Sequence, residues 1–284
     1  MNRRRFLTGL GLAGLGLLGA GGYGLAQAYR FEVTRYRRPL KGLRSPLKVV
    51  QLSDLHFGPY IKEGSIGAWV AAASAEKADL VAITGDLVDS SARVQAGGDT
   101  DLSPLVGQLS RLESRFGTFA IWGNHDNSNP AARAVLERLL PKNKVEILNN
   151  WGLALRPDFF LAGVDDRWRG KPDPVRAFNG YTAGQASLML AHNPDYWDFL
   201  RESPVTLALS GHTHGGQVRL PGIGAPWTPS YYGEMYLSGF FKPGQGSKYL
   251  NIEGFVSRGL GVSGVPLRVN APAELVVFEF EPQG

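Results

Sequence analysis

Polar clusters rich in histidine, aspartate and asparagine follow several short apolar runs in this chain of 284 residues. All 5 histidines lie in these clusters. The candidate ligands are Asp54, His56, Asp86, Asn124, His192, His212 and His214, and His125 and Asp126 stand among them. Because the chain has no cysteine, a metal ion would be held by imidazole, carboxylate or amide groups. Such mixed donors suit borderline divalent cations such as Mn, Fe or Zn.

The stretch LALSGHTHGGQVRL places His212 and His214 one residue apart between glycines. In an extended chain, side chains at positions i and i+2 point to the same side, so both imidazoles would face one cleft while Thr213 faces away. Asp54 and His56 have the same spacing. The donors are too many for one ion and suffice for two, about 3.5–4 Å apart with a carboxylate between them.

The clusters end runs that resemble β-strands, namely LKVVQL, LVAIT, TFAIW, SLMLA and VTLAL. Between the early runs, helices are predicted over residues 65–77, 102–115 and 131–140, the last with Asn129 as cap and Pro130 in the first turn. This alternation predicts a layered α/β fold whose chemistry lies in the loops at the carboxyl ends of the strands. Further strands, predicted to be antiparallel, are KYLNIEGFV, PLRVN and AELVVFEF.

The first 28 residues have the order of an export signal, with Arg3, Arg4 and Arg5 before an apolar run and AQA at its end. The string RRRFLT resembles the twin-arginine signal. This resemblance predicts export to the periplasm, the cell envelope or the outer face of the cytoplasmic membrane. The alternative is a permanent anchor, because the run from Phe6 to Ala28 is long enough to span a bilayer. Residues 29–284 are predicted to form one domain.

The net charge of +5 is concentrated near the N-terminus. The segment from Arg30 to Lys48 holds seven basic residues against Glu32 alone, and without it and the signal the rest of the chain carries a net charge of −4. A nucleic-acid partner is therefore not expected. The basic segment is either the solvent face of an edge strand, as the alternation in FEVTRYRR favours, or a peripheral contact with anionic lipid headgroups.

In their order along the chain, the motifs D-x-H, G-D-x-x-D, G-N-H-D, a lone histidine and G-H-x-H resemble those of the calcineurin-like metallophosphoesterase family. The segments SRGLG and PLRVN resemble its exported, twin-arginine type. The resemblance implies a four-layer αββα sandwich of two mixed β-sheets flanked by helices. It also implies two divalent metal ions, one held by Asp54, His56 and His214, one by Asn124, His192 and His212, with Asp86 between them.

By the same resemblance, the chain hydrolyses a phosphate ester, with phosphodiesters or pyrophosphates favoured. Two cations lower the pKa of a shared water, and the resulting hydroxide, which bridges the two ions, attacks phosphorus in line. His125 is assigned to the leaving group, and Asp126 is predicted to fix its tautomer and orientation. The alternatives are a phosphomonoesterase, a pyrophosphatase acting on lipid-linked UDP-2,3-diacylglucosamine, and a metal-binding scaffold without catalysis. The scaffold predicts loss of ligands or of His125, whereas both Asn124 and His125 are present.

Four other features of the sequence have more than one interpretation or a secondary role. Asp89 either supports the site or accepts hydrogen bonds in a turn. Asp165 and Asp166 are predicted to be structural, with a substrate contact as the alternative, and Arg258 is predicted to lie on the surface. The aromatic side chains between Leu220 and Phe241 either bind a nucleobase or acyl chain or form a local core. The oligomeric state is left open.

Overall fold

The computed structural model describes residues 21–94, 100–200, 202–245 and 251–283, and the twin-arginine motif lies outside these ranges. The strands form two six-stranded sheets. The first sheet has the order β1 (Phe31–Leu40), β12 (Ala273–Pro282), β2 (Leu47–Leu52), β3 (Leu80–Ile83), β4 (Thr118–Ala120) and β5 (Val145–Ile147). The second has the order β10 (Gly239–Phe241), β11 (Gly254–Val256), β9 (Leu207–Ser210), β8 (Ala186–Leu190), β7 (Phe159–Gly163) and β6 (Trp151–Arg156).

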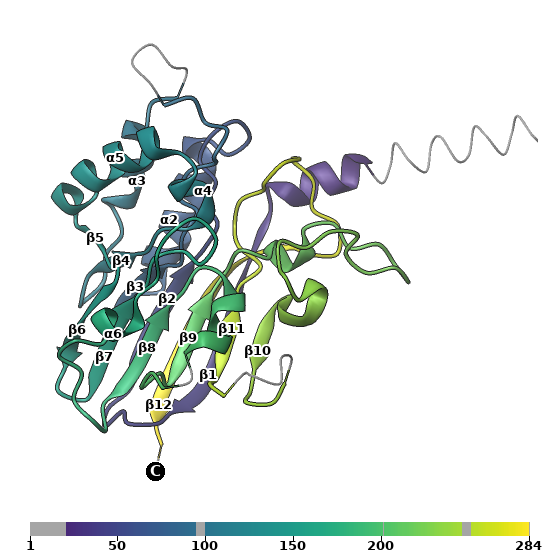
Figure 1. The fold of residues 1–284 in the computed structure, drawn as a ribbon. Coiled ribbons are helices and arrows are strands. Elements are labelled where there is room, and N and C mark those ends of the chain that lie inside the picture. The colour runs from purple at the N-terminus through teal and green to yellow at the C-terminus, as the bar shows by residue number, and fades with distance from the viewer. Residues whose placement is uncertain (1–20, 95–99, 201, 246–250, 284) are drawn as a thin grey trace, which may run out of the picture.

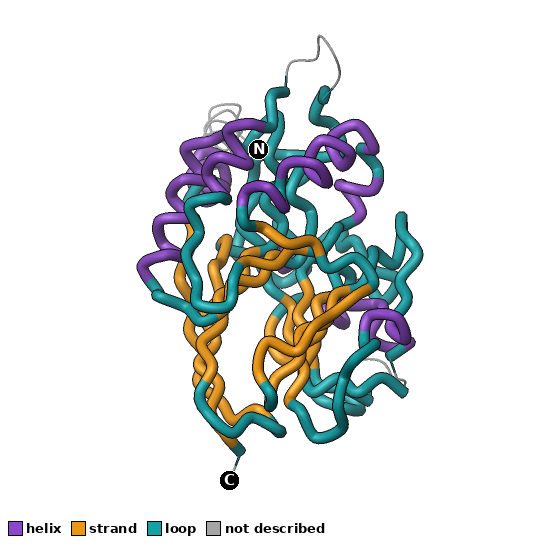
Figure 2. The backbone as a smooth tube through the Cα atoms, turned by 90° about the vertical axis from the view of Figure 1, so that its left-hand side faces the viewer, coloured by secondary structure: helices purple, strands orange, loops and turns teal. Residues whose placement is uncertain are grey.

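Helices cover the outer faces of both sheets (Figures 1 and 2). The helices beside the first sheet are α2 (Glu63–Ala75), α3 (Ser103–Leu109), α4 (Asn124–Asn127), α5 (Pro130–Leu139) and the 3₁₀ turn η1 (Pro141–Asn143). The second sheet is covered by the shorter α6 (Pro174–Ala177), η2 (Pro194–Phe199) and η4 (Gly233–Tyr236), and η3 (His214–Gly216) follows β9. Each sheet contains parallel and antiparallel pairs. The predicted four-layer sandwich of mixed sheets is therefore confirmed.

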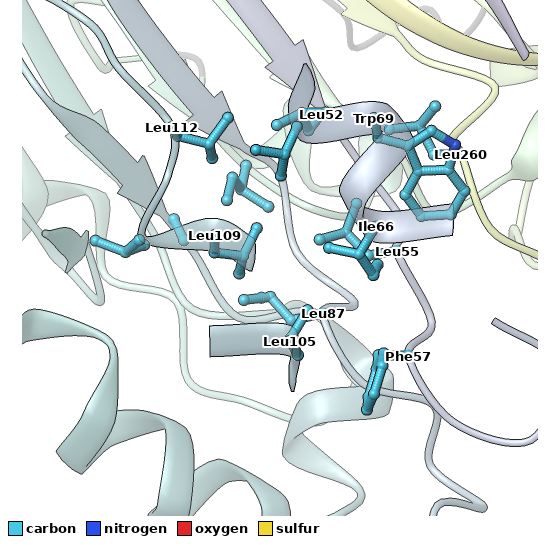
Figure 3. Packing of buried hydrophobic residues seen from close by; sticks show 14 of the residues in the cluster. Leu52, Leu55, Phe57, Ile66, Trp69, Leu87, Leu105, Leu109, Leu112 and Leu260 are labelled. Carbon is cyan, nitrogen blue, oxygen red and sulfur yellow. The ribbon is translucent and has the colours of Figure 1, made fainter. Parts of the chain in front are cut away.

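The hydrophobic core has three layers that correspond to this architecture. One lies between the first sheet and its helices, where Leu52 and Leu55 pack against Ile66 and Trp69 (Figure 3). A second fills the space between the sheets. A third lies between the second sheet and its short helices around Trp197. Because all three layers are apolar, the loops at one edge of both sheets are held on rigid supports.

The predicted antiparallel pairing of the last third is confirmed in part, because β11 pairs antiparallel with β10 and β12 pairs antiparallel with β2, while each also has a parallel neighbour. The strand β12 pairs in parallel with β1 and antiparallel with β2, and β11 pairs in parallel with β9. PLRVN is not a strand and forms only an isolated bridge between Val269 and Val218. The chain does not continue as a strand here because the side chain of Arg268 turns inward and donates to carbonyls of other loops, among them those of His214 and Gly261.

The strand β1 lies at the edge of the first sheet, as the alternation in FEVTRYRR predicted. Three of its arginines form ion pairs with glutamates: Arg35 with Glu76, Arg37 with Glu281 and Arg38 with Glu253. Much of the positive charge of the basic segment is thus neutralised within the protein. Among the described residues, no helix has the length and hydropathy needed to cross a membrane.

Arg268 is a buried cation that organises the C-terminal loops. Its side chain is 0% exposed, and burial lowers its pKa to about 10. The guanidinium donates hydrogen bonds to five backbone carbonyls, those of His214, Arg258, Gly259, Gly261 and Ala271. Because one of these carbonyls belongs to a candidate ligand, Arg268 connects the packing of the C-terminal loop to the functional edge of the sheets.

Replacing Arg268 with methionine is expected to lower the free energy of unfolding by about 3 kcal/mol or more. Methionine fills similar space but leaves several buried carbonyls without a donor, each at a cost of about 1–3 kcal/mol. Urea denaturation followed by circular dichroism measures the change. The matched control is Arg176→Met on the exposed end of α6, expected within about 0.5 kcal/mol of the parent. Equal stability of the two variants would contradict the role of Arg268.

Candidate metal centre

The candidate ligands lie where the carboxyl ends of strands from both sheets meet. Asp54 and His56 follow β2, Asp86 follows β3, Asn124 begins α4 after β4, His192 follows β8, and His212 and His214 follow β9. Backbone hydrogen bonds join these loops, with Asp54 N donating to Gly85 O at 3.1 Å and Gly211 N donating to His192 O at 3.0 Å. The structure thus brings together all seven metal ligands that the sequence predicted.

The donor atoms form two groups that meet at Asp86. One buried group is Asp54, His56 and His214, and another is Asp86, His192 and His212. A third, less buried group is His56, Asp86 and His125, which overlaps both at Asp86 or His56. Oδ2 of Asp86 lies 3.5 Å from His56 Nε2 and 3.2 Å from His192 Nε2. Oδ1 of Asp86 accepts a hydrogen bond from the backbone N–H of His125 at 2.8 Å. Asp86 therefore has one oxygen fixed by the backbone and one oxygen between the two groups.

Several imidazole nitrogens face one another in a way that suits a cation between them. Nε2 of His56 lies 3.0 Å from Nε2 of His214, and Nδ1 of His212 lies 3.2 Å from Nε2 of His192. Nδ1 of His192 lies 2.7 Å from Thr84 O, which can only accept, so the proton sits on Nδ1 and Nε2 presents a lone pair. Asn124 Oδ1 also points at this atom, at 3.1 Å. Facing lone pairs repel unless a cation lies among them, so these residues fit the metals.

Opposite charges buried together set the electrostatics of the cluster. Burial disfavours the charged form of His192, but the carboxylates of Asp86 and Asp54 outweigh it and raise its pKa to about 10. These carboxylates therefore favour a positive charge at Nε2, carried either by a second proton or by a metal ion that displaces this proton. Burial also opposes charge on Asp86, yet attraction to His192 and His125 lowers its pKa. Burial and repulsion from His192 lower the pKa of His212, so this imidazole is neutral, the form that binds metal ions.

The extended backbone predicted at the D-x-H and H-x-H motifs is wrong. His212 and His214 have φ values of 71° and 53°, and Thr213 between them is right-handed at −78°. Asp54 and His56 are likewise left-handed, with φ of 54° and 47°. Side chains two residues apart converge here because the backbone turns sharply at each ligand. Left-handed backbone costs a residue with a Cβ about 1–2 kcal/mol, and such strain is typical of functional sites.

Two glycines allow the carboxylate ligands to lie against the backbone. A Cβ atom at Gly123 would overlap the carboxylate of Asp86. At Gly211, it would overlap the side chains of Ser53 and Asp54. These two glycines thus make room for ligands from other strands, a contact that the sequence alone did not predict.

Replacing Gly123 with alanine is expected to displace the Asp86 carboxylate, lower the bound metal content and slow hydrolysis about 10²-fold, the cost of misplacing a reacting group by about 1 Å. Metal content by plasma emission spectrometry and turnover measure the effect. The control is Gly107→Ala, in the helix α3, where an added Cβ would contact nothing within 4 Å. Full metal content in Gly123→Ala would contradict this steric role.

The predicted contact between Asp126 and His125 is absent. The Asp126 carboxylate is buried and accepts hydrogen bonds from the backbone N–H groups of Leu87, Val88 and Gly123. It turns inward because α4 begins at Asn124, which places Asp126 in the first turn facing the chain that follows Asp86. Burial, with repulsion from Asp86, raises its pKa to about 7. Asp126 therefore holds together the loops that follow β3 and β4 and does not orient the imidazole of His125.

The tautomer of His125 is set by a backbone group instead. The N–H of Ser90 donates to Nδ1 of His125 at 3.1 Å. Burial lowers the pKa of His125, which favours the neutral imidazole, and with Nδ1 accepting, its proton lies on Nε2. Nε2 lies 3.4 Å from the hydroxyl of Ser263.

Asp89 lies between two of the site histidines. Its Oδ2 is 3.3 Å from Nδ1 of His56 and 3.8 Å from Nδ1 of His125. Oδ1 accepts a hydrogen bond from the backbone N–H of Ser91 at 2.9 Å. Asp89 therefore fills both roles left open by the sequence. It supports a ligand, because a carboxylate on Nδ1 keeps the His56 proton there and leaves Nε2 free.

A cavity of about 650 Å³ opens directly over Asp86, Asn124 and His125. The ring of Trp168 lies 4.5 Å from the ring of His212 and lines the cavity together with Arg169. Neither residue was predicted from the sequence. The available signal was the string DDRWRG, an aromatic and two cations directly after a strand.

Asp165 and Asp166 are structural, as predicted. The carboxylate of Asp165 accepts from the Lys171 N–H at 3.0 Å, and that of Asp166 accepts from the Trp168 N–H at 2.7 Å, so they shape the loop that carries Trp168. Arg258 forms ion pairs with Glu274 at 2.9 Å and Glu32 at 3.2 Å, which leaves it engaged away from the cavity.

Most of the aromatic segment forms a local core, which is one of its two predicted roles. Tyr236 is buried, and its hydroxyl and that of Tyr232 donate to Asp198, while Phe240 packs on Phe255, with ring centroids 4.8 Å apart. These residues form a local core. Trp227 is 72% exposed and lines the cavity.

Comparison with known proteins identifies the family of this chain. A family model described as calcineurin-like phosphoesterase matches residues 47–216, which include all seven ligands. An uncharacterized metallophosphoesterase of Bacillus subtilis (strain 168), YkuE, is 32% identical over 292 residues, covering 98% of this chain and 97% of the relative. Phosphodiesterase YaeI of Escherichia coli (strain K12) is 32% identical over 286 residues, covering 98% and 99%. A solved dimetal phosphatase from Danio rerio has a TM-score of 0.49 and 12% identity, covering 78% of this chain and 89% of that chain. This chain therefore belongs to the calcineurin-like phosphoesterase family and is a metal-dependent hydrolase of phosphate esters.

Proposed function

We propose that the protein hydrolyses phosphodiesters or pyrophosphates with two divalent metal ions of the Mn, Fe or Zn class. The observation that carries this proposal is the position of Asp86, whose Oδ2 lies between two groups of ligands. One ion would be held by Asp54, His56 and His214, and the other by Asn124, His192 and His212. When bound, the ions lower the pKa of water and neutralise charge on the phosphoryl oxygens.

The protein groups supply the proton and hold the site in position. His125 presents its protonated Nε2 to the cavity, where it can donate to the departing oxygen. Asn124 adds an amide oxygen to the donor set without negative charge, which reduces repulsion of an anionic substrate. Asp126 holds the chain after Asp86 and the start of α4 together, so that Asp86 and His125 keep their relative positions.

The size and lining of the cavity support an ester with substituents on both sides of phosphorus. At about 650 Å³ it extends past the ligands to Val218, Trp227 and Val265, which is more room than a terminal phosphate requires. Arg169 lines the same cavity and adds one cation to receive further negative charge. A phosphodiesterase among the relatives supports the same choice. A phosphomonoesterase is the competing activity.

Paired substrates test the proposal. The full chain, stripped of metal and reloaded with Mn, Zn, Fe or Mg, is given 4-nitrophenyl phosphate and bis(4-nitrophenyl) phosphate. We expect turnover that requires the metal and is faster on the diester. Faster turnover of the monoester would favour the phosphomonoesterase. No turnover with two equivalents of metal bound would favour the scaffold without catalysis.

We further propose that the protein acts outside the cytoplasm and remains anchored. Export is supported by the string RRRFLT at residues 3–8. Retention of the N-terminal segment is supported by its packing, because Ala28 is 1% exposed in the core and Gly24 O accepts a hydrogen bond from Arg268 N at 3.0 Å. Cleavage after Ala28 would remove both contacts. The N-terminal sequence of the mature protein from the membrane fraction tests this proposal.

A further inference from the structure

Of the thirteen large hydrophobic side chains that are exposed in the described part of the chain, five lie on the two loops that reach the active-site cavity. We call Leu220, Ile223, Trp227, Tyr231 and Val265 the rim. Ile223 and Trp227 are each 72% exposed, and Tyr231 is 77% exposed. Trp227 and Val265 also line the cavity. Soluble proteins usually scatter such side chains singly, so this concentration indicates an interaction surface.

The helix at residues 21–28 packs against the C-terminal loop, and this loop pairs with the segment that leads into the rim. The contact runs through Val269. Its neighbour Arg268 donates its N–H to Gly24 O at 3.0 Å, and Val269 O accepts from the N–H of Arg219, directly before the rim loop, at 2.8 Å. The exposed side chains of this helix and its end are Tyr23, Leu25 and Tyr29. Two segments far apart in sequence are thus joined through the C-terminal loop, and each exposes apolar side chains.

The chain that leads into this helix is itself apolar. Residues 6–20 contain no charged side chain, and Arg3, Arg4 and Arg5 precede them. A segment of this composition followed by tyrosines is typical of chain that enters lipid and meets the interface. Because it joins the body at residue 21, it joins on the side where the rim lies.

We propose that the rim and the outer face of the 21–28 helix dock on a lipid bilayer, so that the catalytic cavity opens at the lipid–water interface. Trp227 and Tyr231 have the amphipathic rings that favour this depth. Residues 219–235 contain one arginine and one glutamate, so the contact is made by apolar insertion rather than by attraction to anionic lipids. A protein partner at the same surface is the competing outcome of the test below.

This position also specifies the substrate, an inference that rests on the proposed function. A cavity that opens at the interface, with Trp168, Trp227 and Val265 in its walls, accepts an amphiphilic phosphate ester whose apolar part stays near the bilayer. The ester phosphate then reaches the ligand cluster without the lipid chain leaving its apolar surroundings. The substrate class is therefore a lipid-linked phosphodiester or pyrophosphate.

Docking is tested without any measure of activity. The chain has no cysteine, so Ile223→Cys can carry a single bimane label. The full chain is reconstituted in phosphatidylcholine vesicles with or without nitroxide-labelled lipid. We expect the label at 223 to shift to the blue and to be quenched by the nitroxide. The matched control is Val175→Cys on α6, which is 84% exposed and should remain open to aqueous iodide. A label at 223 that stays open to iodide on vesicle-bound protein would overturn docking and leave the surface to a protein partner.

The substrate class is tested with two esters. Ile223→Ser is expected to lower turnover of hexadecyl 4-nitrophenyl phosphate in vesicles about tenfold, the effect of losing one buried apolar side chain. Turnover of soluble bis(4-nitrophenyl) phosphate should be unchanged, and Val175→Ser should change neither. An equal effect of Ile223→Ser on both esters would overturn the lipid substrate. No turnover of either ester by the parent protein would contradict the proposed function, while the quenching result would still decide docking.

Discussion

Replacing His125 with alanine is expected to slow hydrolysis about 10²–10⁴-fold, the usual contribution of a positioned general acid. The reason is that Nδ1 accepts the Ser90 N–H, which leaves the proton on Nε2 inside the cavity. The loss should grow as the leaving group becomes more basic, because a poor leaving group depends more on a proton donor. Turnover of a series of aryl phosphodiesters measures this slope.

The control for His125→Ala is its metal content, which should stay at two equivalents. Ser263→Ala removes the hydroxyl 3.4 Å from Nε2 and is expected to have a smaller effect. If His125→Ala instead lost metal and slowed hydrolysis of every ester in the series equally, His125 would be a metal ligand and not the general acid.

Replacing Asp86 with alanine is expected to reduce bound metal below two equivalents and to slow hydrolysis by about 10³-fold or more. A single oxygen of Asp86 lies near donors of both groups, so its loss weakens both positions at once. Each factor of ten in rate corresponds to about 1.36 kcal/mol, and removing metal charge stabilisation costs several kcal/mol.

Thermal stability gives a second measure of the Asp86→Ala variant that does not depend on turnover. A ligand that binds only the folded state raises the melting temperature. Mn should therefore raise the melting temperature of the parent protein and of Asp101→Ala, which removes an exposed carboxylate outside the cluster, but not that of Asp86→Ala. A full Mn response in Asp86→Ala would show that Asp86 is not shared by the two positions.

The positions of the ligands could be predicted because residue type and order carry the information. A histidine, aspartate or asparagine directly after an apolar run lies at a strand end, and strand ends of an α/β fold share one edge. For this reason Asp54, Asp86 and His192 come together from distant parts of the sequence. The three helices between the early strands were also predicted, although α3 ends at Leu109 and not at residue 115.

The local geometry of the ligands could not be predicted because it depends on contacts between strands. The left-handed backbone at His212 and His214 is stabilised by neighbours such as Asp54, whose carboxylate accepts the His212 N–H at 2.9 Å. The spacing of the motifs favoured an extended chain because spacing carries no information about hydrogen-bond partners from other strands. Asp126 was assigned to His125 for the same reason, since adjacency in sequence does not reveal that the first turn of α4 directs the two side chains apart.

Arg268 could not be distinguished from a surface arginine, because a cation buried among carbonyls has no local sequence signal. Its two ends have a mechanical consequence. The backbone N–H holds Gly24 of the N-terminal helix, and the guanidinium holds the carbonyl of His214. One residue thus acts as a short strut between the segment that leads to the chain terminus and a metal ligand. This connection fixes the distance between the N-terminal helix and the catalytic centre. The distance is therefore determined by the fold and not by a flexible linker.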